Sequence, residues 1–416
     1  MRVTSCAIAA PPYPAVIGSR SWTVILAALT ALLALSIDIG LPAQPAIAHA
    51  FDTTSETSQL TLSVFMFSYA CAQLIAGYLS DALGRRRVLV GGLVLFTLAG
   101  VACTLAPTIG TLIAFRGLQG ICAAAGPTIA RAMVRDTQPA AQAARMLSLM
   151  LAAIAIAPMI APVIGGGLLD LFGWRSPFAA LAIAGGALLA VAYAALGETL
   201  PPERRQPPSL PGLVRGYLTF FRTRGTRLPI LIAAATFAGQ FAYISDSPFV
   251  LIEGYGVPAE HFGFYFASTA LALMLGSLGG GRLLRAGRSP GAMVVIGSAL
   301  LLAGGALTAI GTRIPAIGIY GFLPPMLVYF FGIGLTNPSA TALAMEPVPQ
   351  LAGTASAALG FVSYSAGAIA GYATTKLGGS SPRLFGSVVL GTGTAALALA
   401  LLAAALRSST NRDSHT

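Results

Sequence analysis

The chain has 416 residues, of which 9% are charged and 56% are hydrophobic, and its formal net charge is +11. A soluble domain carries about 25% charged residues, so this composition excludes a soluble enzyme and a disordered chain. The four cysteines, at positions 6, 71, 103 and 122, are scattered without metal-ligand spacing. They exclude a disulfide-rich secreted fold and are expected to be buried apolar side chains.

Apolar runs follow one another along the chain, and each is long enough to cross a bilayer as a helix. Twelve are expected, at 22–47, 57–80, 87–106, 109–132, 145–170, 176–197, 228–252, 262–284, 291–312, 316–345, 352–376 and 384–406. The runs are continuous rather than alternating in polarity, which favours helices over a β-barrel. The sequence therefore predicts an all-α membrane protein with twelve transmembrane helices.

A segment rich in Pro and Arg divides the chain into two halves of six runs each. We expect an N-terminal tail at 1–21, a first bundle at 22–197, a linker at 198–227, a second bundle at 228–406 and a C-terminal tail at 407–416. The halves show a faint repeat, because two glycines and an arginine of the first half recur 203 residues later. Internal repeats of this kind are typical of secondary transporters.

The basic residues predict the orientation of the chain. With both termini in the cytoplasm, the cytoplasmic segments hold 19 of the 24 basic residues and the external loops hold four. The orientation of the chain in the membrane then accounts for the net positive charge, and a nucleic-acid partner is not needed to explain it. A secretory leader ending at Ala48-His49-Ala50 is an alternative, but Asp38 interrupts its apolar stretch and cleavage would leave eleven spans.

The clearest local motif joins the second and third runs and contains Gly77, Asp81, Gly84, Arg85 and Arg86. The glycines allow a tight turn and close helix approach, and the aspartate can pair with an arginine. A plain basic loop is the alternative interpretation.

Three charged residues lie within the apolar runs and away from the ends of those runs: Asp38, Arg116 and Asp246. At 1.5 Å per residue, Asp38 is about 24 Å from the internal end of its run and Arg116 about 10 Å from the external end of its own. Both depths fall in the outer half of the membrane, so the two side chains are expected to face one cavity. The opposing effects of burial and of Arg116 make Asp38 a candidate for reversible protonation. A structural ion pair remains the alternative, and Asp246 is either a second proton carrier or a helix cap near Pro248.

The Gly77–Arg87 loop resembles the signature loop of the major facilitator superfamily, and the resemblance extends over the whole chain. Two further segments are similar to drug:proton antiporter motifs: Arg116–Gly120 with Arg131–Asp136, and Pro158–Gly167. Three others narrow the resemblance to the bicyclomycin-resistance (Bcr/CflA) branch: Ser36–Pro45, Ser247–Val250, and Glu346-Pro347 with Gly353–Ser356. Ile39-Gly40 stands where that branch commonly has Met-Tyr. This departure leaves the identity of the substrate open.

The resemblance implies two six-helix bundles and alternating access in a bacterial inner membrane. The expected activity is proton-driven export of small amphiphilic compounds by a monomer, with lipid, protons and the substrate as partners and no cofactor or metal. The sequence contains no phosphate-binding loop, so ATP is not the expected energy source. Export of a metabolite such as an amino acid or sugar is the alternative on the same fold, and a membrane enzyme or sensor is the alternative from another class.

The resemblance also suggests roles for particular residues. A gating cluster would use Gly77, Asp81, Gly84, Arg85, Arg86, Asp136 and Glu346. A kinked helix with Pro158, Pro162, Gly165 and Gly166 would seal the bundle interface, although plain helix packing is equally open. The candidate cavity residues are Tyr69, Gln119, Phe241, Tyr243, Phe361 and Tyr364, because aromatic faces suit bulky apolar or cationic compounds.

Overall fold

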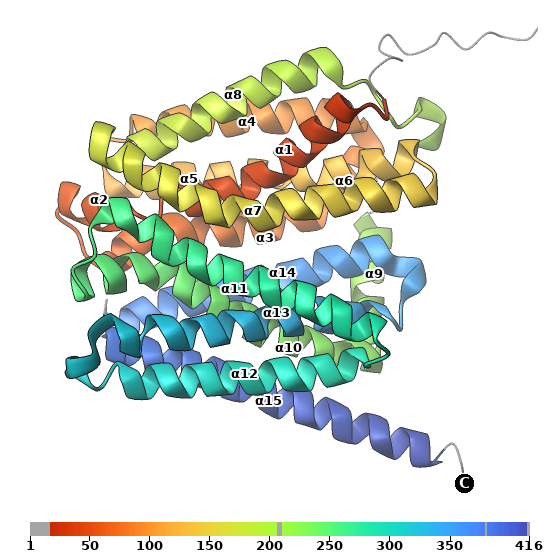
Figure 1. Cartoon of the computed structure of the whole chain (residues 1–416). Helices are drawn as coiled ribbons and strands as arrows, with labels where there is room; N and C mark the ends of the chain where they lie inside the picture. Colours follow the sequence, from red (N-terminus) through yellow and green to blue (C-terminus); the bar gives the residue numbers. More distant parts are fainter. Residues whose placement is uncertain (1–16, 206–209, 379–380, 414–416) are drawn as a thin grey trace, which may run out of the picture.

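Two groups of long helices lie side by side in the computed structural model, which describes residues 17–205, 210–378 and 381–413 (Figure 1). All regular structure within these residues is helical, which confirms the predicted all-α fold. Eleven helices of the described residues are long and apolar enough to cross a membrane. A further long helix, α14 (Ala352–Gly378), packs against both α3 and α10. Twelve crossings and two cytoplasmic termini stay predictions.

The first bundle holds the helices up to residue 195. They are α1 (Arg20–Asp38), α2 (Gln44–Ala50), α3 (Ser55–Leu83), α4 (Arg85–Thr104), α5 (Ile109–Ala123), α6 (Ala125–Thr137), α7 (Ala140–Phe172) and α8 (Ser176–Ala195). Hydroxyl side chains cap several N-termini: Ser19 caps α1, Thr54 caps α3, and Thr108 forms a capping box with Thr111 at α5. These local signals fix where the apolar runs begin as helices.

The second bundle follows the linker. It holds α10 (Arg224–Pro248), the π-helical turn η2 (Phe249–Gly254), α11 (Ala259–Arg285), α12 (Pro290–Gly311), η3 (Pro315–Gly321), α13 (Leu323–Met345), η4 (Pro349–Leu351), α14 and α15 (Pro382–Asp413). Glycines let α12 approach its neighbours closely. A Cβ added to Gly304 would lie 2.7 Å from the Tyr329 nitrogen on α13, and one on Gly305 would lie 2.7 Å from the Val389 carbonyl oxygen on α15.

Two of the predicted runs are broken helices. The run 22–47 divides into α1 and α2, and Gln44 then anchors α2 to α3: its Nε2 donates to Thr61 Oγ1 at 3.1 Å, and its Oε1 accepts from Ser58 Oγ at 2.7 Å. The run 109–132 divides at Ala124 into α5 and α6. Pro127 lacks the N–H that would continue the helical ladder there, which explains this break.

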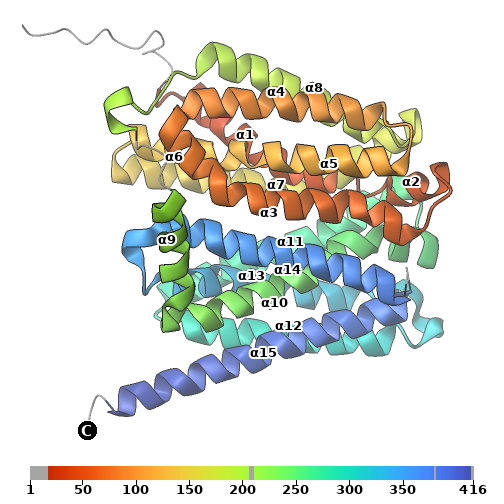
Figure 2. The same ribbon diagram turned by 180° about the vertical axis from the view of Figure 1, so that it is seen from behind.

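The linker contains a short turn, η1 (Pro202–Arg204), and a helix, α9 (Leu210–Arg222), that lies across the ends of the long helices (Figure 2). Phe220 is fully buried and packs beside Ile230 and Val348 of the second bundle. Tyr217 donates a hydrogen bond from its hydroxyl to the Leu74 carbonyl on α3 at 2.8 Å. Burial raises the pKa of Tyr217 to about 12, which keeps this donor protonated.

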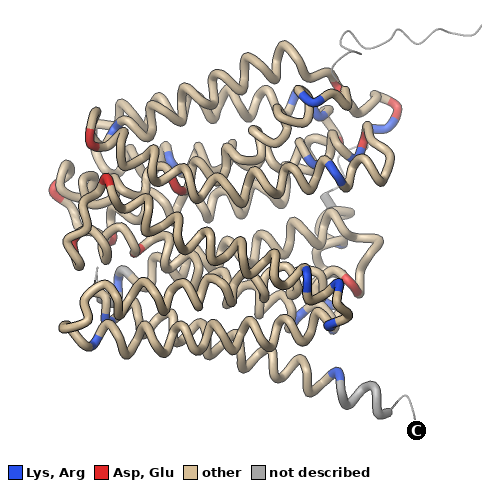
Figure 3. The backbone as a smooth tube through the Cα atoms, viewed as in Figure 1, with Lys and Arg blue, Asp and Glu red and all other residues tan. Residues whose placement is uncertain are grey.

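Charged residues mark the two ends of the molecule (Figure 3). Most Lys and Arg residues lie at the end where α1 begins and α15 ends, which is called here the basic end. The other end is called the opposite end. Between them, exposed apolar side chains such as Leu98, Ile183 and Ile310 cover the outer helix faces. A belt of this kind suits contact with lipid rather than water.

Candidate functional site

Arg116 lies on α5 inside the first bundle and is 3% exposed. Its guanidinium donates to the Ser36 carbonyl on α1 at 2.9 Å and to Gln119 Oε1 at 2.7 Å. A longer hydrogen bond reaches the Thr61 carbonyl on α3 at 3.3 Å. The Phe65 ring lies against the cation, with 4.2 Å between the Arg116 Cζ and the ring centroid. Carbonyl oxygens and an aromatic face thus replace water around the charge and join three helices.

Asp38 ends α1 in the same bundle and is also 3% exposed. The sequence predicted that Arg116 would act on it directly, but the two side chains form no ion pair. Among the described residues, none hydrogen-bonds or ion-pairs with the Asp38 carboxylate. The reason lies in Arg116, whose donors are directed to the carbonyls of Ser36 and Thr61 instead.

Asp246 lies in the last turn of α10 and is 4% exposed. Gln59 Nε2, on α3 of the first bundle, donates to Asp246 Oδ1 at 2.9 Å. The Gln59 Oε1 accepts from Ser245 Oγ at 2.8 Å. One amide side chain therefore connects the two bundles near the opposite end. Sequence reasoning missed Gln59, although a polar side chain at the edge of an apolar run is a signal that could have found it.

The antiporter-like segment of α7 packs at two close helix contacts. A Cβ added to Gly166 would lie 2.9 Å from the Ala259 carbonyl oxygen on α11 of the second bundle. On the facing side, a Cβ on Gly263 would lie 2.8 Å from the Pro162 carbonyl carbon. Gly165 faces the backbone of residue 39, just after α1, within its own bundle. Small residues thus bring α7 and α11 together backbone to backbone near the opposite end.

Aromatic side chains meet where the bundles touch. Tyr69 on α3 and Tyr364 on α14 form an edge-to-face pair with ring centroids 5.1 Å apart. Tyr364 also packs on Phe237 at 4.9 Å, and Phe237 stacks with Phe241 at 6.3 Å. Phe361 lies about one turn before Tyr364 and is half-buried. In this conformation Tyr69, Tyr364 and Phe241 form one continuous aromatic row through Phe237.

Tyr243 does not belong to this group, which corrects the prediction that it lines the cavity. It is fully buried inside the second bundle. Its ring packs against those of Phe266, Phe322, Phe330 and Phe385. The reason is helical geometry: residues 241 and 243 are two positions apart, so their side chains point to different faces. Gln119, also predicted for the cavity, is fully buried beside Arg116.

A charge cluster lies at the basic end of the first bundle. Arg85, at the start of α4, donates from Nε to Asp136 Oδ2 on α6 at 2.9 Å and forms an ion pair with Asp81 on α3. Its backbone N–H donates to Glu198 Oε1 at 2.9 Å. Glu198, which follows α8, is a second residue that sequence reasoning missed. The sequence feature that could have found Glu198 is its position directly after the sixth run, where a carboxylate can cap the N-terminus of a neighbouring helix.

The remaining predicted gating residues divide into two sets. Arg86 donates to the carbonyls of Tyr193 and Leu196, each at 2.8 Å, and Gly84 has a φ of +100°, a conformation that favours glycine. The others lie apart: Gly77 packs on Thr128 of α6, and Glu346 is exposed at the end of α13. Pro158, which was predicted for the kinked helix and not for the gating cluster, is half-buried within α7.

Comparison with known proteins places the chain in a family. A transporter from Bacillus subtilis strain 168, called uncharacterized MFS-type transporter YdgK, is 35% identical over 352 residues, or 83% of this chain and 86% of its own length. The bicyclomycin resistance protein homolog of Haemophilus influenzae is 28% identical over 365 residues (86% and 90%). The chloramphenicol resistance protein of Pseudomonas aeruginosa is 32% identical over 344 residues (80% and 78%).

A solved structure shares the fold. It is a bacterial homolog to the human lysosomal transporter Spinster in an inward-facing and unoccupied conformation, and it superposes with a TM-score of 0.68. The sequences are 17% identical, and the match covers 93% of this chain and 96% of the other. Residues 26–372 match the sequence profile of the Major Facilitator Superfamily. With most of its length in that match, the chain belongs to the Major Facilitator Superfamily.

Proposed function

We propose that this protein exports small amphiphilic compounds from a bacterial cytoplasm in exchange for protons, as a monomer in the inner membrane. Relatives whose names refer to bicyclomycin, chloramphenicol and multidrug resistance support this substrate class. The observation that carries the coupling is Asp38, a carboxyl group that is 3% exposed among apolar helices and has no hydrogen bond or ion pair with a described residue. An isolated carboxylate is costly there, so proton uptake is favoured.

In this proposal the bundles rock about the aromatic contacts of Tyr69 and Tyr364. Opening the opposite end to accept a proton requires Gln59 to leave Asp246 and Gly166 to leave the α11 backbone. The Arg85 cluster lies at the other end of the first bundle and would hold that end during the movement. Arg116 fixes α1, which carries Asp38, to α3 and α5, so protonation of Asp38 acts on a rigid unit.

The test is substrate-induced proton release from inverted membrane vesicles, read with a pH-sensitive dye against antibiotics and metabolites. Asp38→Asn is compared with wild type and with Asp170→Asn, which changes an exposed acid at the opposite end. We expect a response to at least one antibiotic that Asp38→Asn abolishes and Asp170→Asn preserves. A response kept by Asp38→Asn would move the coupling to Asp246. Responses to metabolites alone would refute drug export and favour the metabolite exporter.

A further inference from the structure

Helix α15 diverges from the second bundle toward the basic end (Figures 1 and 2). Two cavities of about 720 and 750 Å³ lie beneath its diverging part, one toward α12 and the other toward α10. They share Gly291, Leu343, Glu346, Ala404 and Arg407 as lining residues. Together they form one forked groove floored by α13, which is called here the α15 groove.

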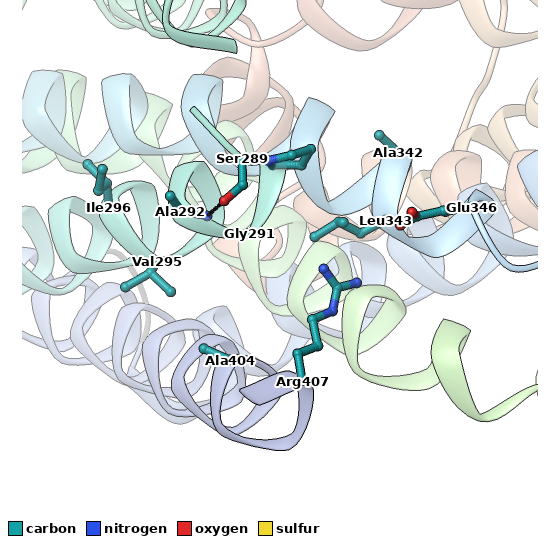
Figure 4. A pocket seen from close by; sticks show the side chains of 11 residues that line it. Ser289, Gly291, Ala292, Val295, Ile296, Ala342, Leu343, Glu346, Ala404 and Arg407 are labelled. Atoms are coloured by element: carbon teal, nitrogen blue, oxygen red, sulfur yellow. Dashed lines mark hydrogen bonds between the residues drawn. The ribbon is translucent and has the colours of Figure 1, made fainter. Parts of the chain in front are cut away.

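The walls of the α15 groove are apolar, and its charges are few. Arg407 extends from α15 into the groove toward Leu343 (Figure 4), and a Cβ added to Gly291 would lie 3.9 Å from its Nη1. Arg224, at the start of α10, lines the branch toward that helix. Glu346 is the acidic residue on the rim. Within the described chain, neither arginine forms an ion pair or a side-chain hydrogen bond.

These features define the chemistry of an occupant. Two apolar branches suit two hydrocarbon chains, and two unpaired arginines at the rim suit a phosphate. The groove lies at helix ends: α10 begins at Arg224, α12 is capped by Ser289, and α13 ends before Glu346. This is the depth of lipid headgroups in one leaflet, where basic pockets between helices recruit anionic lipids. A headgroup with hydroxyl donors would also satisfy the Glu346 carboxylate.

We propose that the α15 groove binds an anionic glycerophospholipid of phosphatidylglycerol chemistry. Its phosphate contacts Arg224 and Arg407, its acyl chains fill the two branches, and its headgroup hydroxyls face Glu346. The net positive rim selects this lipid over a zwitterionic one, in which a choline cation would face the same arginines. The bound lipid then fills the space beneath the diverging end of α15.

Native mass spectrometry of the full-length protein in detergent tests this proposal. The protein is titrated with dioleoyl phosphatidylglycerol or dioleoyl phosphatidylcholine, and the fraction carrying one lipid is measured. Each arginine near a lipid surface is worth about a 5-fold change in affinity, so Arg224→Gln with Arg407→Gln should weaken phosphatidylglycerol binding about 25-fold. The double variant Arg282→Gln with Arg285→Gln is the control, because it removes the same charge from the same end outside the groove.

A second variant separates shape from charge. Ala404 lines both branches, so Ala404→Trp should exclude the acyl chains and reduce binding while both arginines remain. Equal binding of the two lipids by wild type would overturn the proposal, as would phosphatidylglycerol binding that neither the arginine pair nor Ala404→Trp reduces. Displacement of phosphatidylglycerol by an exported antibiotic with higher affinity would also overturn it, since the groove would then be a substrate entrance.

Discussion

Gly263→Ala should shift the balance between the two ends of the transporter. Gly263 lies on α11 where that helix touches α7 of the other bundle near the opposite end. Its missing side chain is what allows the contact, because an added Cβ would lie 2.5 Å from the Val163 nitrogen and Cα and 2.8 Å from the Pro162 carbonyl carbon. These are backbone atoms, so no side-chain rotation can relieve the overlap.

The size of the effect follows from these distances. Carbon atoms in contact prefer about 3.5–4.0 Å, so the two backbones must separate by about 1 Å. Overpacking of this kind costs about 1–3 kcal/mol. The cost applies only to the conformation in which α7 and α11 touch at this point. The population with the opposite end closed should therefore fall about 5- to 150-fold relative to the open one.

Electron–electron distance measurements between spin labels can follow this shift. Phe172 at the end of α7 and Tyr320 in η3 are 72% and 78% exposed and lie on different bundles at the opposite end, so both accept labels. In a cysteine-free background, Gly263→Ala should enlarge the long-distance population. Gly167→Ala is the control, because a Cβ there would have no atom within 4 Å. Identical distance distributions for wild type and Gly263→Ala would refute the reasoning.

Three other predictions concern single contacts. Gln59→Leu removes a hydrogen-bond donor to the buried Asp246, and a hydrogen bond to a charged acid contributes about 1.5–3 kcal/mol. The variant should therefore slow transport in the vesicle assay and favour opening of the opposite end. Gln73→Leu is the control: the buried Gln73 Nε2 has no described partner, so its loss should change transport little in the same assay. Arg85→Ala leaves Asp81 and Asp136 without their cation. Because the Asp81 and Asp136 side chains are 45% and 19% exposed, this loss should destabilise the first bundle by about 1–3 kcal/mol, seen as a lower thermal unfolding temperature. Arg87→Ala, at an exposed position, should cost under about 0.5 kcal/mol, and equal losses for the two variants would contradict the cluster. Tyr217 has a folded pKa of about 12, above the value of 10.0 for a free tyrosine, so its stabilising effect is complete below pH 10 and is lost as the pH rises toward 12. Wild type should therefore lose stability relative to Tyr217→Phe over that window, measured by chemical denaturation at each pH, and parallel curves would refute this.

The helices followed from the sequence because bilayer thickness and capping residues act locally. The division of 22–47 did not, since the apolar residues of α2 continue the run and only the contacts of Gln44 with α3 reveal the turn. Those contacts depend on how two helices pack, which periodicity does not contain.

The candidate site likewise combines contacts that follow from local sequence spacing with contacts that depend on how the helices pack. Asp81 and Arg85 are four positions apart, so their pairing follows from sequence spacing, even with Gly84 ending the helix between them. Asp38 and Arg116 were placed at compatible depth, but depth leaves the direction of each side chain open, and Arg116 turns to backbone carbonyls. Gln59 and Asp246 are 187 positions apart, and only the placement of one bundle against the other brings them together.

Helix α9 determines how the chain can be divided into two polypeptides. Because Phe220 is buried in the second bundle, a break after residue 222 would leave that side chain on the wrong fragment and open a hole in its former site. A break between residues 198 and 210 keeps α9 with its packing partners. The second fragment would then present Tyr217 to α3, adding one polar contact to complementation of the halves when they are produced separately.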